Sequence, residues 1–282
     1  MEPIVLTRTD VWSLLPDRDP WGHKGDFGKL LLLCGSLGYT GAAALAARAA
    51  LRSGAGLIYL GVPSSIYEVE AGKLDEPVVF PLPDREGMLS EEAVSPILKR
   101  LSGCDAVLLG PGMGQSSGVL AVVQAVLTHS TAPIVLDADG INVLAPHRNI
   151  LRGRTSHVIL TPHDGEFRRL GGILTSDRGA SAASLAQELG VHVLLKGHRT
   201  VITDGHRLYE NHTGNSGMAT GGSGDVLAGI LVSMLGMGLP PLEAAACAAW
   251  LHGAAGDLCA RRLGQYGMLP SDLIETLPRL LK

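Results

Sequence analysis

The sequence predicts an α/β protein built on a central, mostly parallel sheet with helices on both faces. Short apolar runs alternate along the chain with alanine-rich stretches of helical spacing, which is the pattern of βαβ units. Hydrophobic residues make up 46% of the chain against 18% charged and 4% aromatic, as expected for strands that are buried on both faces. The 37 glycines suit many tight strand-to-helix turns. We expect residues 1–282 to form one domain, because single α/β domains often reach this length.

Short apolar runs mark the predicted strands, and each is followed by a loop rich in Gly, Pro or Asp: residues 30–34, 57–62, 106–109, 134–136, 157–160 and 193–195. Residues 42–52 and 226–239 are predicted as helices, and residues 74–88, with several prolines and charges, as a surface connection. In open parallel sheets ligands bind beyond the carboxyl ends of the strands. The loops are therefore expected to converge on one site.

Charge and composition exclude several classes of protein. A net charge of −4 without any run of Lys or Arg argues against a nucleic-acid or membrane surface. The longest apolar run, residues 226–239, would span about 21 Å as a helix, short of the roughly 30 Å core of a bilayer. Residues 1–20 carry charges and no apolar core, so no signal peptide is expected and the predicted location is cytoplasmic. The four scattered cysteines indicate reduced, buried thiols.

A glycine loop at residues 215–225 runs directly into the apolar helix. Gly222 and Gly224 have no Cβ, so their N–H groups can crowd around a phosphate, and the helix N-terminus adds unpaired donors and its positive dipole end. Asp225 would repel a bound phosphate, which makes sense if it takes a proton from a hydroxyl that attacks phosphorus. The alternative is that Asp225 is only the N-cap of the helix.

Several familiar motifs are absent. The lysine after Gly28 is followed by leucine, so there is no Walker A loop, and residues 110–114 lack the spacing of the dinucleotide fingerprint. The serine-hydrolase elbow is missing, and the ten histidines form no i,i+4 pair for zinc. His252 and Trp250 lie in an alanine-rich segment and are predicted to pack in the core.

Three further loops carry polar side chains or bare backbone. The two lysines of residues 23–29 could meet phosphate, or the loop could be a solvated basic turn. Residues 110–114 could bring backbone amides up to a ligand, or form only a tight turn. Asp137, at a strand end, could hold a hydroxyl or a hydrated magnesium ion, whereas Asp139 is predicted to cap the next helix.

Two loops near the middle of the chain complete the candidate site. His163 and Glu166 are three residues apart, which places them on one face of an opening helix turn. His163 could contact substrate or be an ordinary capping or surface histidine. Lys196 and Thr200 follow a strand and could bracket a nucleotide phosphate, with Gly197 allowing the backbone to come close.

Seven motifs in this order resemble the ADP- or ATP-dependent NAD(P)H-hydrate dehydratase family, whose fold is ribokinase-like. The resemblance runs from about His23 to Asp257 and rests on these segments: His-Lys-Gly-Asp-Phe-Gly, Gly-Ala-Ala with Ser-Gly-Ala-Gly, Gly-Pro-Gly-Met-Gly, Leu-Asp-Ala-Asp-Gly-Ile-Asn, Thr-Pro-His-Asp-Gly-Glu, Leu-Lys-Gly-His-Arg-Thr and Gly-Gly-Ser-Gly-Asp.

The resemblance implies roles for individual residues. Contacts to the hydrated dinucleotide would come from Ala42, Gly112, Gly114, His163 and Asp225. Contacts to the nucleotide would come from Lys196, Gly197, His198, Arg199, Thr200, Gly222 and Gly224. Sugar kinases of this fold have Asn-x-x-Glu near their magnesium ion, and His163-x-x-Glu166 stands here instead. This departure fits the dehydratase better than a sugar kinase, and Glu166 is the candidate metal residue only because it keeps the position of the kinase glutamate.

The implied activity is metabolite repair by a lyase. NADH or NADPH hydrated at C6 would be dehydrated while ADP, or alternatively ATP, is hydrolysed with Mg²⁺ present. Relatives often carry a fused epimerase domain, but only about twenty residues precede His23, so a separate epimerase is expected to act on the same pool. Two alternatives remain, a kinase for a small hydroxymethyl or hydroxyethyl heterocycle and a non-catalytic nucleotide-binding assembly protein. A homo-oligomer, a tetramer or larger, is expected because alanine-rich helices such as residues 244–255 would leave apolar surface to cover.

Overall fold

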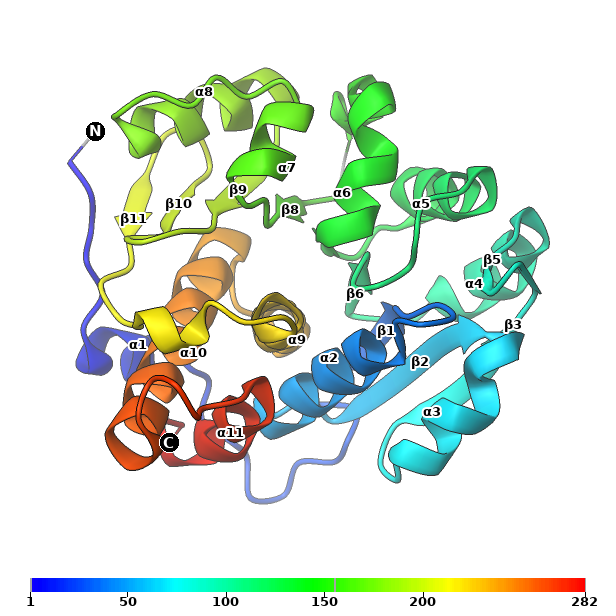
Figure 1. Ribbon diagram of the computed structural model, residues 1–282, viewed down its shortest axis with the longest axis horizontal. Helices are drawn as coiled ribbons and strands as arrows, with labels where there is room; N and C mark the ends of the chain where they lie inside the picture. The colour runs from blue at the N-terminus through cyan, green and yellow to red at the C-terminus, as the bar shows by residue number, and fades with distance from the viewer. Residues whose placement is uncertain (1, 155, 282) are drawn as a thin grey trace.

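The computed structural model describes residues 2–154 and 156–281 and confirms the predicted α/β class (Figure 1). Nine strands form one sheet in the order β11-β10-β9-β8-β7-β6-β1-β2-β3. All neighbours are parallel except that β10 is antiparallel to both β9 and β11. The strands are β1 (Lys29–Leu33), β2 (Leu57–Pro63), β3 (Val78–Leu82), β6 (Ala106–Leu109), β7 (Ile134–Leu136), β8 (Val158–Leu160), β9 (His192–Leu195), β10 (Val201–Thr203) and β11 (Leu208–Glu210).

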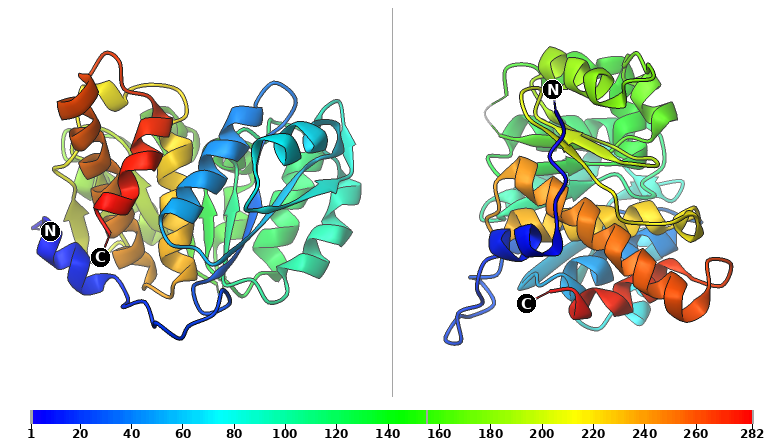
Figure 2. Two further views of the ribbon diagram at one scale, coloured as in Figure 1. Left: turned by 90° about the horizontal axis from the view of Figure 1, so that it is seen from below. Right: turned by 90° about the vertical axis from the view of Figure 1, so that its left-hand side faces the viewer.

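Helices cover both faces of this sheet, as the two views of Figure 2 show. Side chains alternate along a strand, so Leu30 and Leu32 of β1 enter one core while Leu31 and Leu33 enter the other. The first core holds α1 (Arg8–Leu14), α2 (Thr40–Arg52), α3 (Tyr67–Lys73), α9 (Ser223–Gly236), α10 (Pro241–Leu263) and α11 (Pro270–Thr276). The second holds α4 (Val94–Leu101), α5 (Ser117–His129), α6 (Ala138–Leu144), α7 (Asp164–Arg169) and α8 (Arg178–Leu189).

Helix α9 is the innermost helix of the first layer, and Figure 1 shows it almost along its axis. It packs against α2, α10 and the central strands, which explains why it is apolar on every side. The prediction of a buried helix is confirmed, although α9 begins three residues earlier than residue 226. Its first turn therefore belongs to the glycine loop.

The prediction that residues 74–88 form only a surface connection is wrong. They contain the edge strand β3 and most of a small hairpin of β4 (Asp84–Arg85) and β5 (Met88–Leu89). Pro81 concealed the strand, because proline cannot donate to a sheet ladder. An edge strand tolerates proline, and Pro81 lies opposite Val62 of β2.

The loop at residues 23–28 lies away from the expected phosphate. It precedes β1 and therefore sits at the amino ends of the strands, where Gly28 is packed against Gly236 at the C-terminal end of α9. His23 and Asp26 pair with each other at the surface, 2.9 Å apart. Of the two predictions for this loop, the basic turn is confirmed and the phosphate contact is wrong.

All four cysteines are free and buried, as predicted. Within residues 2–154 and 156–281, none of the helices has the length and apolar character needed to cross a membrane.

Candidate active site

The loops that follow β1, β6, β7, β8 and β9 meet at one edge of the sheet, because these strands are parallel neighbours. The closest backbone approach is at Gly110, which has φ of +127°. A Cβ at this position would lie 1.7 Å from the carbonyl oxygen of Asp137. Only glycine can hold the loop after β6 against the start of α6.

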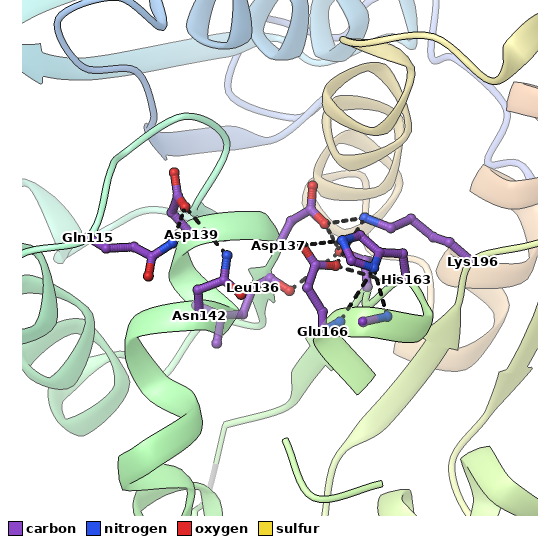
Figure 3. A network of polar contacts seen from close by, with 10 residues as sticks. Gln115, Leu136, Asp137, Asp139, Asn142, His163, Glu166 and Lys196 are labelled. Atoms are coloured by element: carbon purple, nitrogen blue, oxygen red, sulfur yellow. Dashed lines mark hydrogen bonds and ion pairs between the residues drawn. The ribbon is translucent and has the colours of Figure 1, made fainter. Parts of the chain in front are cut away.

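Asp139 does not cap α6, which corrects the prediction from the sequence. The N-cap position is occupied by Asp137, and Asp139 lies in the first turn. The Asp139 carboxylate accepts a hydrogen bond from the backbone N–H of Gly114 at 2.9 Å. It accepts another from Nε2 of Gln115 at 3.2 Å (Figure 3). Asp139 thus fixes the end of the glycine-rich loop after β6.

Three of the residues that the sequence assigns to the hydrated dinucleotide follow strands β1 and β6: Ala42 comes after β1, and Gly112 and Gly114 come after β6. A Cβ on Gly112 would be 2.9 Å from Cβ of Ala42 at the start of α2. The buried Ser36 hydroxyl donates to the Gly112 carbonyl oxygen at 2.7 Å. Ala42, Gly112 and Gly114 therefore lie near one another at the sheet edge.

A second group of candidate site residues is the ionic cluster of Asp137, Glu166 and Lys196 (Figure 3). Lys196 Nζ lies 2.8 Å from Asp137 Oδ1 and 3.7 Å from Glu166 Oε2. The two carboxylate residues are only 2% and 4% exposed. Burial by itself would lower the pKa of Lys196, but the charges of Asp137 and Glu166 outweigh it and raise that pKa. The ammonium group stays charged and faces the sheet edge.

His163 and Glu166 form a reciprocal cap on α7, which confirms that they share one face. Nδ1 of His163 accepts from the Gly165 N–H at 2.9 Å, and Glu166 Oε2 accepts from the His163 N–H at 2.8 Å. The capping role of His163 is confirmed. Its side chain is still 54% exposed, so the ring is also accessible to a ligand.

The turn at residues 196–200 is braced internally. The Thr200 hydroxyl donates to the Gly197 carbonyl oxygen at 3.0 Å and accepts from the Gly197 N–H at 3.2 Å. Exposed Arg199 has φ of +55° and lies 3.6 Å from Glu210, and His198 is exposed. Thr200 therefore holds the turn, while the Lys196 side chain reaches the acidic cluster.

Arg178, which was not predicted as a site residue, supports this turn by hydrogen bonding. Its Nη2 donates to the Lys196 carbonyl oxygen at 2.8 Å, and its Nη1 lies 2.8 Å from Asp164 at the start of α7. It links the helix of His163 to the turn of Lys196. No local pattern marks Arg178, because its partners are 14 and 18 residues away.

Asp225 is not a helix cap. The N-cap of α9 is Gly222, with φ of +94°, and Asp225 is the third helical residue. Within the described residues no hydrogen bond or ion pair holds its carboxylate. A Cβ on Gly224 would lie 3.7 Å from Lys196 Nζ, which places the ammonium group beside this first turn.

The environment of Asp225 suits a base. Burial first, and then the negative charge of Asp137, raise the pKa of Asp225 from 3.8 to about 7, against an opposing effect of Lys196. A carboxylate with a pKa near neutrality can both take up and release a proton at physiological pH.

A magnesium ion would find part of its ligand set here. Over residues 2–154 and 156–281 no three His, Cys, Asp or Glu side chains are grouped to hold a metal ion. Mg²⁺, however, usually takes one or two carboxylates together with waters and substrate phosphates. Buried Asp137 and Glu166 could supply the two carboxylate ligands, and phosphate oxygens and waters would supply the others.

A mostly parallel sheet, with a glycine loop and a helix N-terminus at its edge and a carboxylate beside a partly buried lysine, is typical of nucleotide-binding proteins of ribokinase-like fold. The comparison with solved structures agrees. A ribokinase-like superfamily protein from Enterococcus faecalis superposes with a TM-score of 0.86 at 28% identity, covering 98% of this chain and 94% of that one.

A sequence model of the NAD(P)H-hydrate dehydratase family matches residues 30–279, and the chain belongs to this family. It is 44% identical over 285 residues to the bifunctional NAD(P)H-hydrate repair enzyme Nnr of Moorella thermoacetica, covering 99% of this chain and 54% of that protein. It is 39% identical to the ADP-dependent (S)-NAD(P)H-hydrate dehydratase of Neisseria meningitidis, covering 89% and 84%. The ADP/ATP-dependent NAD(P)H-hydrate dehydratase of Bacillus subtilis, co-crystallised with ATP/Mg²⁺, superposes with a TM-score of 0.82 at 33% identity, covering 97% and 96%. The chain spans about half the length of the bifunctional relatives.

Proposed function

We propose that this protein dehydrates C6-hydrated NADH or NADPH and couples the reaction to hydrolysis of ADP to AMP and phosphate. The observation that carries this proposal is Asp225, a carboxylate in the first turn of α9 that serves no cap and has a pKa of about 7. The ADP-dependent relative from Neisseria meningitidis supports ADP as the nucleotide. The free, buried cysteines fit a reducing cytoplasm.

In the proposed reaction Asp225 accepts the proton of the C6 hydroxyl while that oxygen attacks the β-phosphorus of ADP, and AMP leaves. The N–H groups of Gly222 to Gly224 and the Lys196 ammonium group stabilise the charge on the transferring phosphoryl group. The ring nitrogen lone pair then expels phosphate from C6, and loss of the C5 proton restores the double bond. Magnesium, with Asp137 and Glu166 as its protein ligands, would neutralise phosphate charge.

The two groups of residues suggest how the ligands divide the site. Ala42, Gly112 and Gly114 would contact the hydrated dinucleotide. The turn at residues 196–200, with Gly222 and Gly224, would contact the adenylate. Asp225 would stand between the two ligands, where the reacting hydroxyl meets the phosphoryl group.

The test is recovery of reduced nicotinamide. The protein is mixed with hydrated NADH, magnesium and either ADP or ATP, and the near-ultraviolet absorbance of NADH is followed. We expect recovery, faster with ADP. Absence of recovery with either nucleotide would rule out the dehydratase.

A kinase acting on a small hydroxymethyl or hydroxyethyl heterocycle uses the same base and anion site, so it is the second candidate. A stable phosphorylated product, without release of phosphate, would identify it. Nucleotide binding without turnover of either substrate would instead identify an assembly protein. The presence of a base with a pKa of about 7 favours the two enzymes over the third candidate.

A further inference from the structure

The segment that leads into the glycine loop is attached along one side of α10. The Asn211 amide donates to the Ala249 carbonyl oxygen at 3.1 Å, and the Thr213 hydroxyl donates to the Trp250 carbonyl oxygen at 3.0 Å. These bonds bring the chain to α10 two residues before the loop begins.

Asp257 of α10 then holds the first residues of the loop. Its two carboxylate oxygens accept separately from the Gly214 N–H at 2.9 Å and from the Asn215 side-chain amide at 3.0 Å. The other atom of the same amide, Asn215 Oδ1, accepts from the Gly217 N–H at 3.0 Å. The anchoring therefore continues into the loop itself.

His252 holds the other end of the loop. Its Nε2 lies 3.2 Å from the hydroxyl of Ser223, the first residue of α9. Burial, with a smaller effect of the Lys196 charge, lowers the pKa of His252 to about 4 against a raising contribution from Ser223. The ring is therefore neutral at physiological pH and attaches α9 without adding a charge near the phosphate site.

Between these two anchors the loop is open. Residues 219–221 are exposed, and a Cβ on Gly221 would meet nothing within 4 Å. Two side chains five positions apart on one helix thus fix both ends of a loop whose middle is accessible to a ligand. Misplacement of reacting groups by about 1 Å can cost roughly 10²-fold in rate.

We propose that Asp257 and His252 are positioning residues that hold the glycine loop against α10 and thereby align its N–H groups and Asp225 with the phosphoryl group. This proposal rests on the proposed function for its effect on rate, but its structural part can be tested alone. Neither residue touches the substrate, and both act through the loop.

The first experiment measures amide hydrogen exchange in residues 214–224 of the full chain. Asp257→Ala and His252→Ala should each raise exchange there by roughly tenfold or more, because the loop opens locally. Asp257→Asn keeps an oxygen acceptor for the Gly214 N–H and should restore much of the protection. Glu243→Gln is the matched control, since Glu243 lies near the start of the same helix, where it pairs with Arg207 at 2.7 Å, and exchange in the loop should stay at the wild-type rate.

The second experiment measures turnover of hydrated NADH in a double-mutant cycle. Asp257→Ala should lower kcat by roughly 10- to 100-fold with a smaller change in KM. The same substitution in an Asp225→Asn background should cost clearly less, because only the alignment of the loop N–H groups is then left to lose. A merely structural role would give equal losses in both backgrounds and would overturn the proposal. Should Asp257→Ala not fold, as checked by circular dichroism, His252→Ala carries the same cycle.

Unchanged exchange in both alanine variants would overturn the proposal whether or not the protein acts on hydrated dinucleotides. Faster exchange together with an inactive wild-type protein would support the anchoring and refute the proposed function. The two ideas can therefore fail separately.

Discussion

At the scale of single residues, the ionisation of Asp225 is set by its burial and by neighbouring charges of both signs. Burial, Asp137 and Asp139 raise the pKa of Asp225 and favour its protonated form, whereas Lys196 favours the carboxylate. Lys196 is itself held by Asp137 at 2.8 Å and by Glu166 at 3.7 Å. A change at any of these positions should therefore be visible in the titration of Asp225.

Replacement of Asp225 by asparagine removes the base and keeps the size of the side chain. We expect Asp225→Asn to fold and to bind ADP as tightly as wild type or tighter, because one negative charge beside the phosphates is lost. Turnover should fall by roughly 10²–10⁴-fold, the usual contribution of a general base. Calorimetric binding and single-turnover assays measure the two effects. Near-normal turnover would show that another group takes the proton.

The pH dependence follows from the same pKa of about 7. The carboxylate is the active form, so kcat/KM should rise with pH and level off above about 7.

The free energy of unfolding should change with pH in the opposite direction. A carboxyl group whose folded pKa is raised contributes stability below its unfolded pKa, 3.8, and loses it as pH rises through about 7.

Urea unfolding of Asp225→Asn tests this sign. The variant should be more stable than wild type at about pH 8, by up to about 4 kcal/mol, and equal to it at about pH 3. A variant that is less stable at the higher pH would mean that the ionised carboxylate is favourably paired in the folded protein.

Lys196→Ala should weaken nucleotide binding more than binding of the hydrated dinucleotide. Loss of a charge-assisted contact to phosphate costs about 1.5–3 kcal/mol. The variant also removes the positive charge that lowers the pKa of Asp225, so the rise of activity should move to higher pH. Equal losses of affinity for both ligands, measured by calorimetry, would contradict the division of the site.

At the scale of elements, the sequence predicted best where burial leaves a simple pattern. The runs at 106–109 and 134–136 coincide with β6 and β7, because these central strands are apolar throughout. Strand β3 was missed, since an edge strand keeps one side free and accepts Pro81. The prediction that His163 and Glu166 lie on one face of a helix turn was also correct, because a helix turn is a local structure.

Contacts between segments that lie far apart in the chain could not be predicted from the sequence. Asp137 and Asp139 are both plausible caps by type, and only the position of Gly114 shows which carboxylate meets the loop. Asp257 and Arg178 were missed for the same reason. Their partners lie on other elements, and a single sequence has no periodicity that connects them.

Gly110 offers a test of how tightly the loop after β6 is packed. Gly110→Ala combines a positive φ of 127° with a contact of 1.7 Å to a backbone oxygen, so the backbone must shift, at a cost of roughly 3 kcal/mol or more. Gly103→Ala is the matched control, because Gly103 has φ of +89° and open space around its Cβ position. It should cost about 1–2 kcal/mol. Equal free energies of unfolding for the two variants would refute the close approach.

At the scale of the whole molecule, the predicted homo-oligomer needs a different interface from the one first expected. The alanine-rich stretch at residues 244–255 is largely buried inside the protein, so the reason drawn from the sequence is wrong. Exposed apolar side chains lie instead at the end of α10 and on the connection to α11, where Leu263, the last residue of α10, is 42%, Tyr266 108% and Leu269 58% exposed. Residues of this size gathered on one short segment mark a contact surface in many soluble proteins.

We therefore expect a homo-oligomer, a tetramer or larger, whose contacts include Tyr266. Light scattering of the wild-type protein at working concentration should give a mass well above that of one chain. Tyr266→Asp places a charge on the exposed segment and should shift the mass toward smaller species, because burying an unpaired charge is costly. Ile173→Asp is the control, since Ile173 is 81% exposed on the connection between α7 and α8, and it should leave the mass unchanged.

Residues 263–269 also border the glycine loop, because a Cβ on Gly217 would lie 2.7 Å from the Gln265 carbonyl oxygen. An interface at these residues would support the same loop that carries Asp225. Tyr266→Asp should therefore lower turnover as well as the mass of the oligomer. A monomeric wild-type protein with full turnover would show that one chain completes the site alone.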